Sequence, residues 1–115
     1  MHTINLKNIM KNFEFQTQKI EKAAELLKAV AHPLRFTLLK LINEMKEVNV
    51  NVLYKTLNFE QSVTSQHLKI LRGVGVVKTR RDGKKIYYSI NYPIVESMQN
   101  GIELFLDGVS ASSLE

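Results

Sequence analysis

The dipeptide Asp82-Gly83 constrains the fold of this chain more than any other feature. It lies between two short runs of β-branched and aromatic residues, in the segment VVKTRRDGKKIYYSI that covers residues 76–90. Two such runs joined by Asp-Gly predict a β-hairpin with a two-residue turn. Helical periodicity dominates the rest of the chain, so we expect a mainly α-helical protein with one small hairpin.

Five helices are predicted from apolar residues that recur every three or four positions. They cover approximately residues 16–31, 33–45, 52–57, 61–72 and the segment that follows Tyr92. The expected core-facing stripe of the first helix consists of Ile20, Ala23, Ala24, Leu27 and Ala31. Asn51 is expected to cap the short third helix. The last helix has more apolar residues than one core-facing stripe needs, which suggests that it also packs against a second subunit.

At 115 residues, the chain has the length of one small domain. We expect a polar N-terminal extension at residues 1–15, the domain at 16–108 and a tail at 109–115, with Leu114 and Glu115 interpreted as a cloning scar. No apolar run approaches the ~18 residues of a membrane span, and no secretion signal is visible, so a cytoplasmic protein is expected. The absence of cysteine excludes disulfides, thiolate metal ligands and thiol switches.

The predicted helix at residues 61–72 has two different faces. Thr64, Leu68 and Leu71 share one face and should point to the core, so the polar side chains around Ser65 and Gln66 turn outward. A short helix, a tight break and a polar helix form a helix-turn-helix, and the second helix of such a motif can enter the major groove of DNA. The basic hairpin that follows would then act as a "wing" against the DNA backbone.

Positive charge is concentrated in the same region. Residues 61–91 contain seven Lys or Arg residues and one acid, whereas residues 92–115 contain four acids and no Lys or Arg. A basic cluster is the expected signature of a surface that binds polyanions, although a solvated basic face gives the same pattern. The predicted contacts to double-stranded DNA are Gln61, Ser62, Thr64, Ser65, Gln66, His67, Lys69, Arg72, Arg80, Arg81, Lys84 and Lys85.

Three sequence features resemble the ArsR/SmtB-type winged helix-turn-helix repressors. They are LLKAVAHPLRFTLLKLI, SVTSQHLKILRGVGVVKTRRDGKKIYYSI and the spacing between these segments, and the resemblance covers roughly residues 24–105. It implies a homodimeric transcriptional repressor that binds a short inverted repeat and dimerises through its N- and C-terminal helices.

The chain departs from this family at the positions where many members sense metals. The residues that match a Cys-x-Cys pair are Asn49 and Asn51, and the last helix contains no histidine. An amide oxygen is a poor ligand for soft metals, so we expect neither a metal site nor another cofactor. The signal that controls the protein stays open: a small apolar ligand between the terminal helices and a change in protein level are both compatible with the sequence.

Two other functions fit the sequence less well than DNA binding. Enzymatic activity is not expected, because the sequence has no nucleophile elbow, glycine-rich phosphate loop or suitably spaced pair of acids. The main alternative is a winged-helix adaptor that binds another protein instead of DNA. His32, which precedes Pro33, is expected to cap a helix or to contact another helix, and His67 is expected to pack or contact a phosphate.

Overall fold

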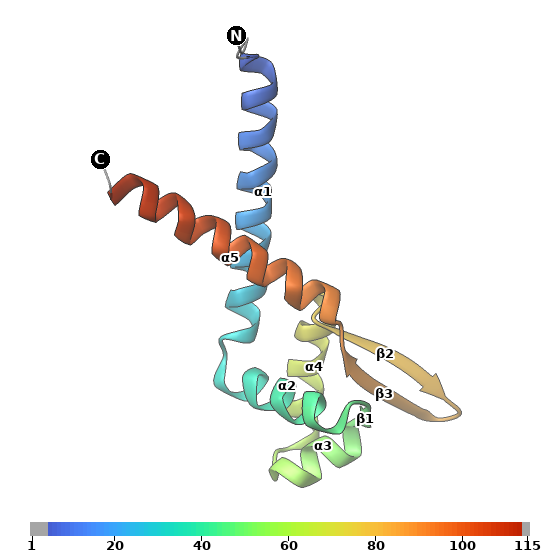
Figure 1. The fold of residues 1–115 in the computed structure, drawn as a ribbon. Coiled ribbons are helices and arrows are strands. Elements are labelled where there is room, and N and C mark those ends of the chain that lie inside the picture. Colours follow the sequence, from blue (N-terminus) through green and yellow to red (C-terminus); the bar gives the residue numbers. More distant parts are fainter. Residues whose placement is uncertain (1–4, 114–115) are drawn as a thin grey trace.

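In the computed structural model, which describes residues 5–113, the helices pack together and a small sheet extends from one side of them (Figure 1). The elements in chain order are α1 (Leu6–Val30), α2 (Pro33–Met45), β1 (Val48–Asn49), α3 (Val50–Leu57), α4 (Gln61–Gly73), β2 (Val77–Asp82), β3 (Lys85–Ile90) and α5 (Tyr92–Ser113). The strand order is β1-β3-β2, and both pairings are antiparallel. This arrangement confirms the prediction of a winged helix-turn-helix that is mainly α with a small hairpin. The expected cloning scar lies outside the described residues.

Helix α1 is longer than the sequence pattern predicted. It begins at Leu6 instead of near Gln16, and the side chain of Asn5 caps it by accepting a hydrogen bond from the Lys7 backbone amide at 3.1 Å. Its N-terminal half extends away from the rest of the molecule (Figure 1). Leu6, Ile9, Met10 and Phe13 recur at helical spacing in these first turns, so the description of residues 1–15 as a polar extension overlooked a helical pattern, and all four side chains are exposed.

The predicted core stripe of α1 is only partly correct. Ala23 is buried, but Ala24, Leu27 and Ala31 are exposed, and the buried positions are Ala23, Leu26, Ala29 and Val30. Both sets recur at helical spacing, and the difference between them is a small rotation about the helix axis. Leu26 and Val30 belong to the core, whereas Ala24 and Leu27 line a trough between α1 and α5 that is open to solvent.

The core lies where α2, α3 and α4 meet the base of the sheet. Its fully buried members include Leu38, Ile42, Leu53, Leu68 and Leu71. His32 caps α2 as predicted, because its Nδ1 accepts a hydrogen bond from the Leu34 amide at 3.1 Å.

Helix α3 begins earlier than predicted and has a different cap. Asn49, not Asn51, is the N-cap, and its Oδ1 accepts a hydrogen bond from the Val52 amide at 3.1 Å. Asn49 also pairs with Tyr87 in the sheet, so strand β1 passes directly into α3. Asn58 ends the helix in the left-handed conformation with φ 55°, which provides the break before α4.

The hairpin forms, but its turn is shifted by one residue. Asp82 pairs with Lys85, so the two-residue loop is Gly83-Lys84 instead of Asp82-Gly83. Gly83 has φ 62°, and a glycine with positive φ at the first loop position is the requirement of a type II′ turn. The shift places Asp82 within β2, on the same face as Arg80.

Helix α5 crosses α1 (Figure 1). The contact depends on Gly101, which is buried against Ala23 and Lys19 of α1. Ile94, Val95 and Met98 in the first half of α5 pack against the core, whereas Phe105 and Leu106 further along are about half exposed. None of the helices formed by residues 5–113 is long and apolar enough to span a membrane.

Candidate nucleic-acid interface

Helix α4 presents a continuous polar surface to solvent. Thr64, Leu68 and Leu71 are buried on its inner face, as predicted. The side chains that are exposed on the other side are Gln61, Ser62, Ser65, Gln66 and Lys69. These side chains offer hydroxyl, amide and ammonium groups, which are the groups that contact base edges and phosphates in a DNA groove.

Thr64 does not belong to this surface. Its side chain is completely buried, and its hydroxyl donates a hydrogen bond to the Glu60 carbonyl oxygen at 2.9 Å. A hydroxyl that is both buried and already bonded is not accessible to a duplex, so its inclusion among the predicted DNA contacts disagrees with the structure. The sequence did indicate this, because Thr64 shares the helical spacing of Leu68 and Leu71.

Arg72 is exposed and lies one helical turn after Lys69, at the C-terminal end of the outward face. It lies in the last turn of α4, eleven residues after Gln61, which corresponds to about 16 Å along the helix. Its role as a DNA contact stays a prediction that depends on how far a duplex extends along α4.

His67 turns away from the outward face and towards the start of α2. It is half-buried, and its ring centroid lies 4.7 Å from that of His32. Its Nδ1 is buried without a hydrogen-bond partner, and so is the Nε of Arg35 nearby. Burial, followed by the charges of His32 and Arg35, lowers the pKa of His67 below its ordinary value of 6.5. A role in packing between α2 and α4 fits this environment better than contact with a phosphate.

The two arginines of the hairpin lie on opposite faces of the sheet, because successive side chains of a strand alternate. Arg81 pairs with Ile86 and shares its face with Tyr88, which packs against the core. Arg80 pairs with Tyr87 on the other face, where its guanidinium carbon lies 4.9 Å from the centre of the tyrosine ring.

Arg80 is also bound to a carboxylate of the same chain. Its Nη2 donates to Glu47 Oε1 at 2.6 Å, and its Nε lies 3.1 Å and 3.2 Å from the two oxygens. This hydrogen bond, together with the charge of Arg80, lowers the pKa of Glu47 from its ordinary value of 4.5, so Glu47 is ionised at neutral pH. Sequence reasoning missed Glu47, because it is 33 positions away from Arg80 and no local pattern connects them.

A hollow of about 280 Å³ joins the outward face of α4 to the tip of the hairpin. It is lined by Asn49, Val50, Asn51, Ser65, Lys84, Lys85, Ile86 and Tyr88. The start of α3, the middle of α4 and two lysines at the tip of the hairpin therefore border one concave surface. Lys84 and Lys85 are exposed, and neither has a carboxylate within 4.0 Å in the described part of the chain.

Three comparisons with known proteins agree with this geometry. Residues 32–79 match the sequence model of the bacterial regulatory protein arsR family. The transcriptional repressor PagR of Bacillus anthracis is 44% identical over 88 residues, which cover 74% of this chain and 85% of PagR. The transcriptional activator HlyU of Vibrio cholerae is 33% identical over 93 residues, which cover 81% of this chain and 85% of HlyU. In the crystal structure of PagR from B. anthracis, the protein superposes on this chain with a TM-score of 0.64 and 39% sequence identity. The superposition covers 76% of this chain and 98% of the PagR chain.

This chain belongs to the ArsR family of bacterial transcriptional regulators. The hairpin of β2 and β3 is therefore named the wing below. The comparisons do not favour the adaptor hypothesis, because these relatives are named as transcriptional regulators.

Asn49, at one of the two positions where the resemblance places a metal-binding cysteine, has a structural role in this ArsR-family chain. Its side-chain oxygen accepts the hydrogen bond that caps α3, so the residue is already used in folding. Within residues 5–113, no three His, Asp or Glu side chains form a group that could hold a metal ion. The expectation that metals do not regulate this protein stays a prediction.

Replacement of Glu47 with glutamine is expected to raise affinity for duplex DNA about 3- to 10-fold at 150 mM salt. The change removes one negative charge beside the wing and frees the Arg80 guanidinium for a phosphate. Fluorescence anisotropy with a labelled duplex measures the effect, and a titration at several salt concentrations tests its electrostatic origin. In the parent protein, Arg80→Ala should weaken binding less than Arg81→Ala. Equal losses of DNA affinity in the two variants would contradict the interpretation that the ion pair with Glu47 makes Arg80 less available to a phosphate.

Stability is expected to fall as the pH decreases from 7.5 to 5.5, in part because of His67. The folded protein lowers the pKa of this histidine below 6.5. Between pH 7.5 and 5.5 the unfolded chain therefore binds more protons than the folded chain. The contribution of neutral His67 is fully present above pH 6.5 and is lost as the pH falls towards the lowered value. Urea unfolding at the two pH values measures this dependence. It should be weaker in His67→Gln, and an unchanged dependence in that variant would assign the effect to other groups.

Proposed function

We propose that this protein is a homodimeric transcriptional repressor that binds an inverted-repeat operator in double-stranded DNA. The observation that carries the proposal is the concave surface shared by Ser65 of α4 and by Lys84 and Lys85 of the wing. The major groove admits one α-helix, and cations beside it can neutralise phosphates of the flanking backbone. In this arrangement, the polar face of α4 contacts base edges while the wing holds the backbone.

Within this proposal, the residues of α4 differ in their roles. Gln61 and Gln66 are suited to adenine, because a glutamine amide can donate and accept in a bidentate pair, and Lys69 is suited to guanine or to a phosphate. Ser62 and Ser65 can donate hydrogen bonds to either partner. Arg81, Lys84 and Lys85 contact phosphates, whereas Arg80 contributes less because Glu47 holds it.

A second copy of the chain is supported by an apolar trough between α1 and α5. The trough has a volume of about 380 Å³ and is lined by Ile20, Ala23, Ala24, Leu27, Gly101, Ile102, Phe105 and Leu106. Leu27, Phe105 and Leu106 are between 44% and 54% exposed, and a contiguous apolar surface of this kind is typical of a subunit interface. Two copies joined here would present two α4 helices, which matches the symmetry of an inverted repeat.

Repression, as opposed to activation, is proposed from the relatives. PagR is named a repressor and is 44% identical to this chain, whereas HlyU is named an activator and is 33% identical. The proposal includes no catalytic step and no cofactor, and it places the protein in the cytoplasm, where an operator would be accessible.

Selection of bound duplexes from a random pool tests the proposal. The expected result is an inverted repeat whose half-sites are separated by about one helical turn or a multiple of it. With Gln66→Ala, one base position in each half-site should lose its preference while the symmetry is retained. If the folded protein selects no motif and its binding does not depend on salt, DNA recognition is rejected. That result would favour the hypothesis of an adaptor that binds another protein.

A further inference from the structure

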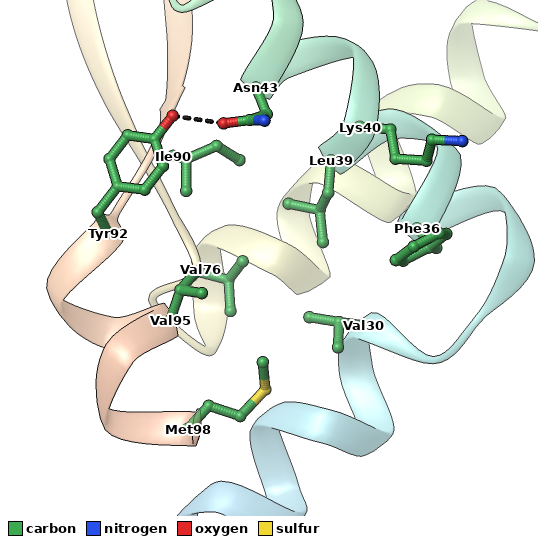
Figure 2. A pocket seen from close by; sticks show the side chains of 10 residues that line it. All are labelled: Val30, Phe36, Leu39, Lys40, Asn43, Val76, Ile90, Tyr92, Val95 and Met98. Atoms are coloured by element: carbon green, nitrogen blue, oxygen red, sulfur yellow. Dashed lines mark hydrogen bonds between the residues drawn. The ribbon is translucent and has the colours of Figure 1, made fainter. Parts of the chain in front are cut away.

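A second hollow lies on the side of the core that faces α5, away from the surface proposed to bind DNA. It has a volume of about 380 Å³, within the range of about 300–1,000 Å³ that small-molecule sites occupy. Figure 2 shows that its walls come from the end of α1, from α2, from the base of the wing and from the first turns of α5. The apolar side chains that form the walls include Val30, Leu39, Val76, Ile90, Val95 and Met98.

The polar groups of this hollow are grouped along one edge. Asn43 and Tyr92 are joined by a hydrogen bond in which the tyrosine hydroxyl donates to Asn43 Oδ1 at 2.5 Å (Figure 2). The bond occupies the amide oxygen and leaves the amide nitrogen of Asn43 without a partner within the described residues. That nitrogen lies on the side of Asn43 that faces Lys40 in this view.

Lys40 is the charged residue of this hollow. It stands one helical turn before Asn43 on α2, so the two side chains share a face. Its ammonium lies 6.0 Å from the centre of the Phe36 ring at one end of the hollow, and no carboxylate lies within 4.0 Å of it in the part of the chain that the structure describes. The flexible four-carbon stem of lysine lets this cation reach across the opening.

Apolar walls beside two hydrogen-bond donors, one of them charged, define the chemistry of an occupant. We propose that this hollow binds a medium-sized carboxylate with an apolar body, whose body contacts Val95 and Met98 and whose head group pairs with Lys40 and Asn43. A carboxylate is an acceptor that carries negative charge, so it satisfies both donors at once. A neutral molecule of the same shape would leave the cation unpaired.

The position of the hollow also connects it to the wing. Val76 immediately precedes β2 and Ile90 ends β3, so an occupant contacts both ends of the hairpin as well as α5. Binding there would change the affinity for DNA only if the bound and free forms hold the wing differently. This regulatory part of the inference rests on the proposed function, whereas the binding part does not.

The binding part is tested with decanoate, with decan-1-ol as the uncharged equivalent and acetate as the head group alone. Methyl NMR of the full chain should show saturable shifts at Val95 and Met98 with decanoate, binding at least about tenfold weaker with decan-1-ol, and no shifts with acetate. 2-Naphthoate is a second probe, and the stronger of the two carboxylates shows whether the site prefers a chain or a ring. Absence of shifts at these methyl groups with both carboxylates would overturn the proposal.

Two variants separate the head group from the body. Lys40→Met should weaken decanoate about tenfold and leave decan-1-ol unchanged, while the control Lys55→Met on α3 should change neither. Val95→Phe fills the hollow and should abolish binding of both compounds, with cooperative thermal unfolding as the check that the chain still folds. Identical decanoate affinities for Lys40→Met and Lys55→Met would contradict the assigned role of the cation. Intermolecular NOEs from α1 of a second copy to Met98 would also reject the proposal, because the hollow would then belong to a subunit interface.

The regulatory part has its own measurement. Decanoate should change affinity for the selected duplex at least about threefold in the parent protein and have no effect in Val95→Phe. If decanoate binds but the protein recognises no duplex, the proposed function fails while the ligand site stands. If the duplex binds with the same affinity with and without saturating decanoate, regulation through this site is rejected.

Discussion

Gly101→Ala is expected to lower the free energy of unfolding by about 1–3 kcal/mol, because the new methyl group overpacks the crossing of α1 and α5. A Cβ at this position would collide with the side chain of Ala23 and lie 2.9 Å from the carbonyl oxygen of Lys19. Neither atom can move without displacing the α1 backbone. Urea unfolding at a fixed protein concentration measures the loss.

Gly73→Ala is the matched control for this variant. Gly73 is also a helical glycine, but a Cβ added to it would have nothing within 4 Å. Alanine is the better helix former by as much as about 1 kcal/mol, so Gly73→Ala should leave stability unchanged or raise it. Equal effects of the two substitutions would mean that α1 and α5 do not approach each other this closely.

Removal of three cations from the wing is expected to have the largest effect on DNA binding. The triple variant Arg81→Ala, Lys84→Ala and Lys85→Ala should lose about 100-fold in duplex affinity at 150 mM salt. Its dependence on salt should also weaken, by about 0.9 in the slope of log K against log salt for each lost phosphate contact. The loss should be similar for all sequences, because contacts to phosphates carry no base information. Fluorescence anisotropy at several salt concentrations measures both quantities.

A second triple variant controls for net charge. Lys7, Lys11 and Lys28 are exposed lysines of α1, and Lys7 and Lys11 lie in the N-terminal half that extends away from the wing (Figure 1). Replacing all three with alanine changes the net charge by the same amount but should lower affinity less than about threefold. A comparable loss in both variants would show that the wing acts only through the overall field of the protein.

The sequence predicted the helix-turn-helix well, because its signals are local. In α4 the polar and apolar residues separate cleanly at helical spacing, so the inward position of Leu68 and the outward position of Gln66 followed from periodicity. The same periodicity placed Thr64 in the core, where the structure has it. Its inclusion among the predicted DNA contacts was therefore inconsistent with the pattern itself. The hairpin was equally clear from its β-branched and aromatic flanks.

Predictions failed where two local patterns were nearly equivalent. Asn49 and Asn51 are both good N-caps, and pairing of Asn49 with Tyr87 decides between them. The loops Asp82-Gly83 and Gly83-Lys84 differ by one residue and keep the same side chains on each face, but only the second pairs the buried Val77 with the buried Ile90. In α1, Leu26 belongs to the core, whereas the adjacent Leu27 lines the trough between α1 and α5.

The sequence by itself determined the order of the elements, the two faces of α4 and the concentration of positive charge between residues 61 and 91. These properties depend on neighbours a few positions apart. Only the tertiary structure decided that Glu47 binds Arg80, that Ser65 lies beside Lys84 and Lys85, and that Lys40 and Asn43 border an apolar hollow. Such contacts join segments that are far apart in the chain, and their geometry is set by how the helices and the sheet pack, which no local pattern encodes.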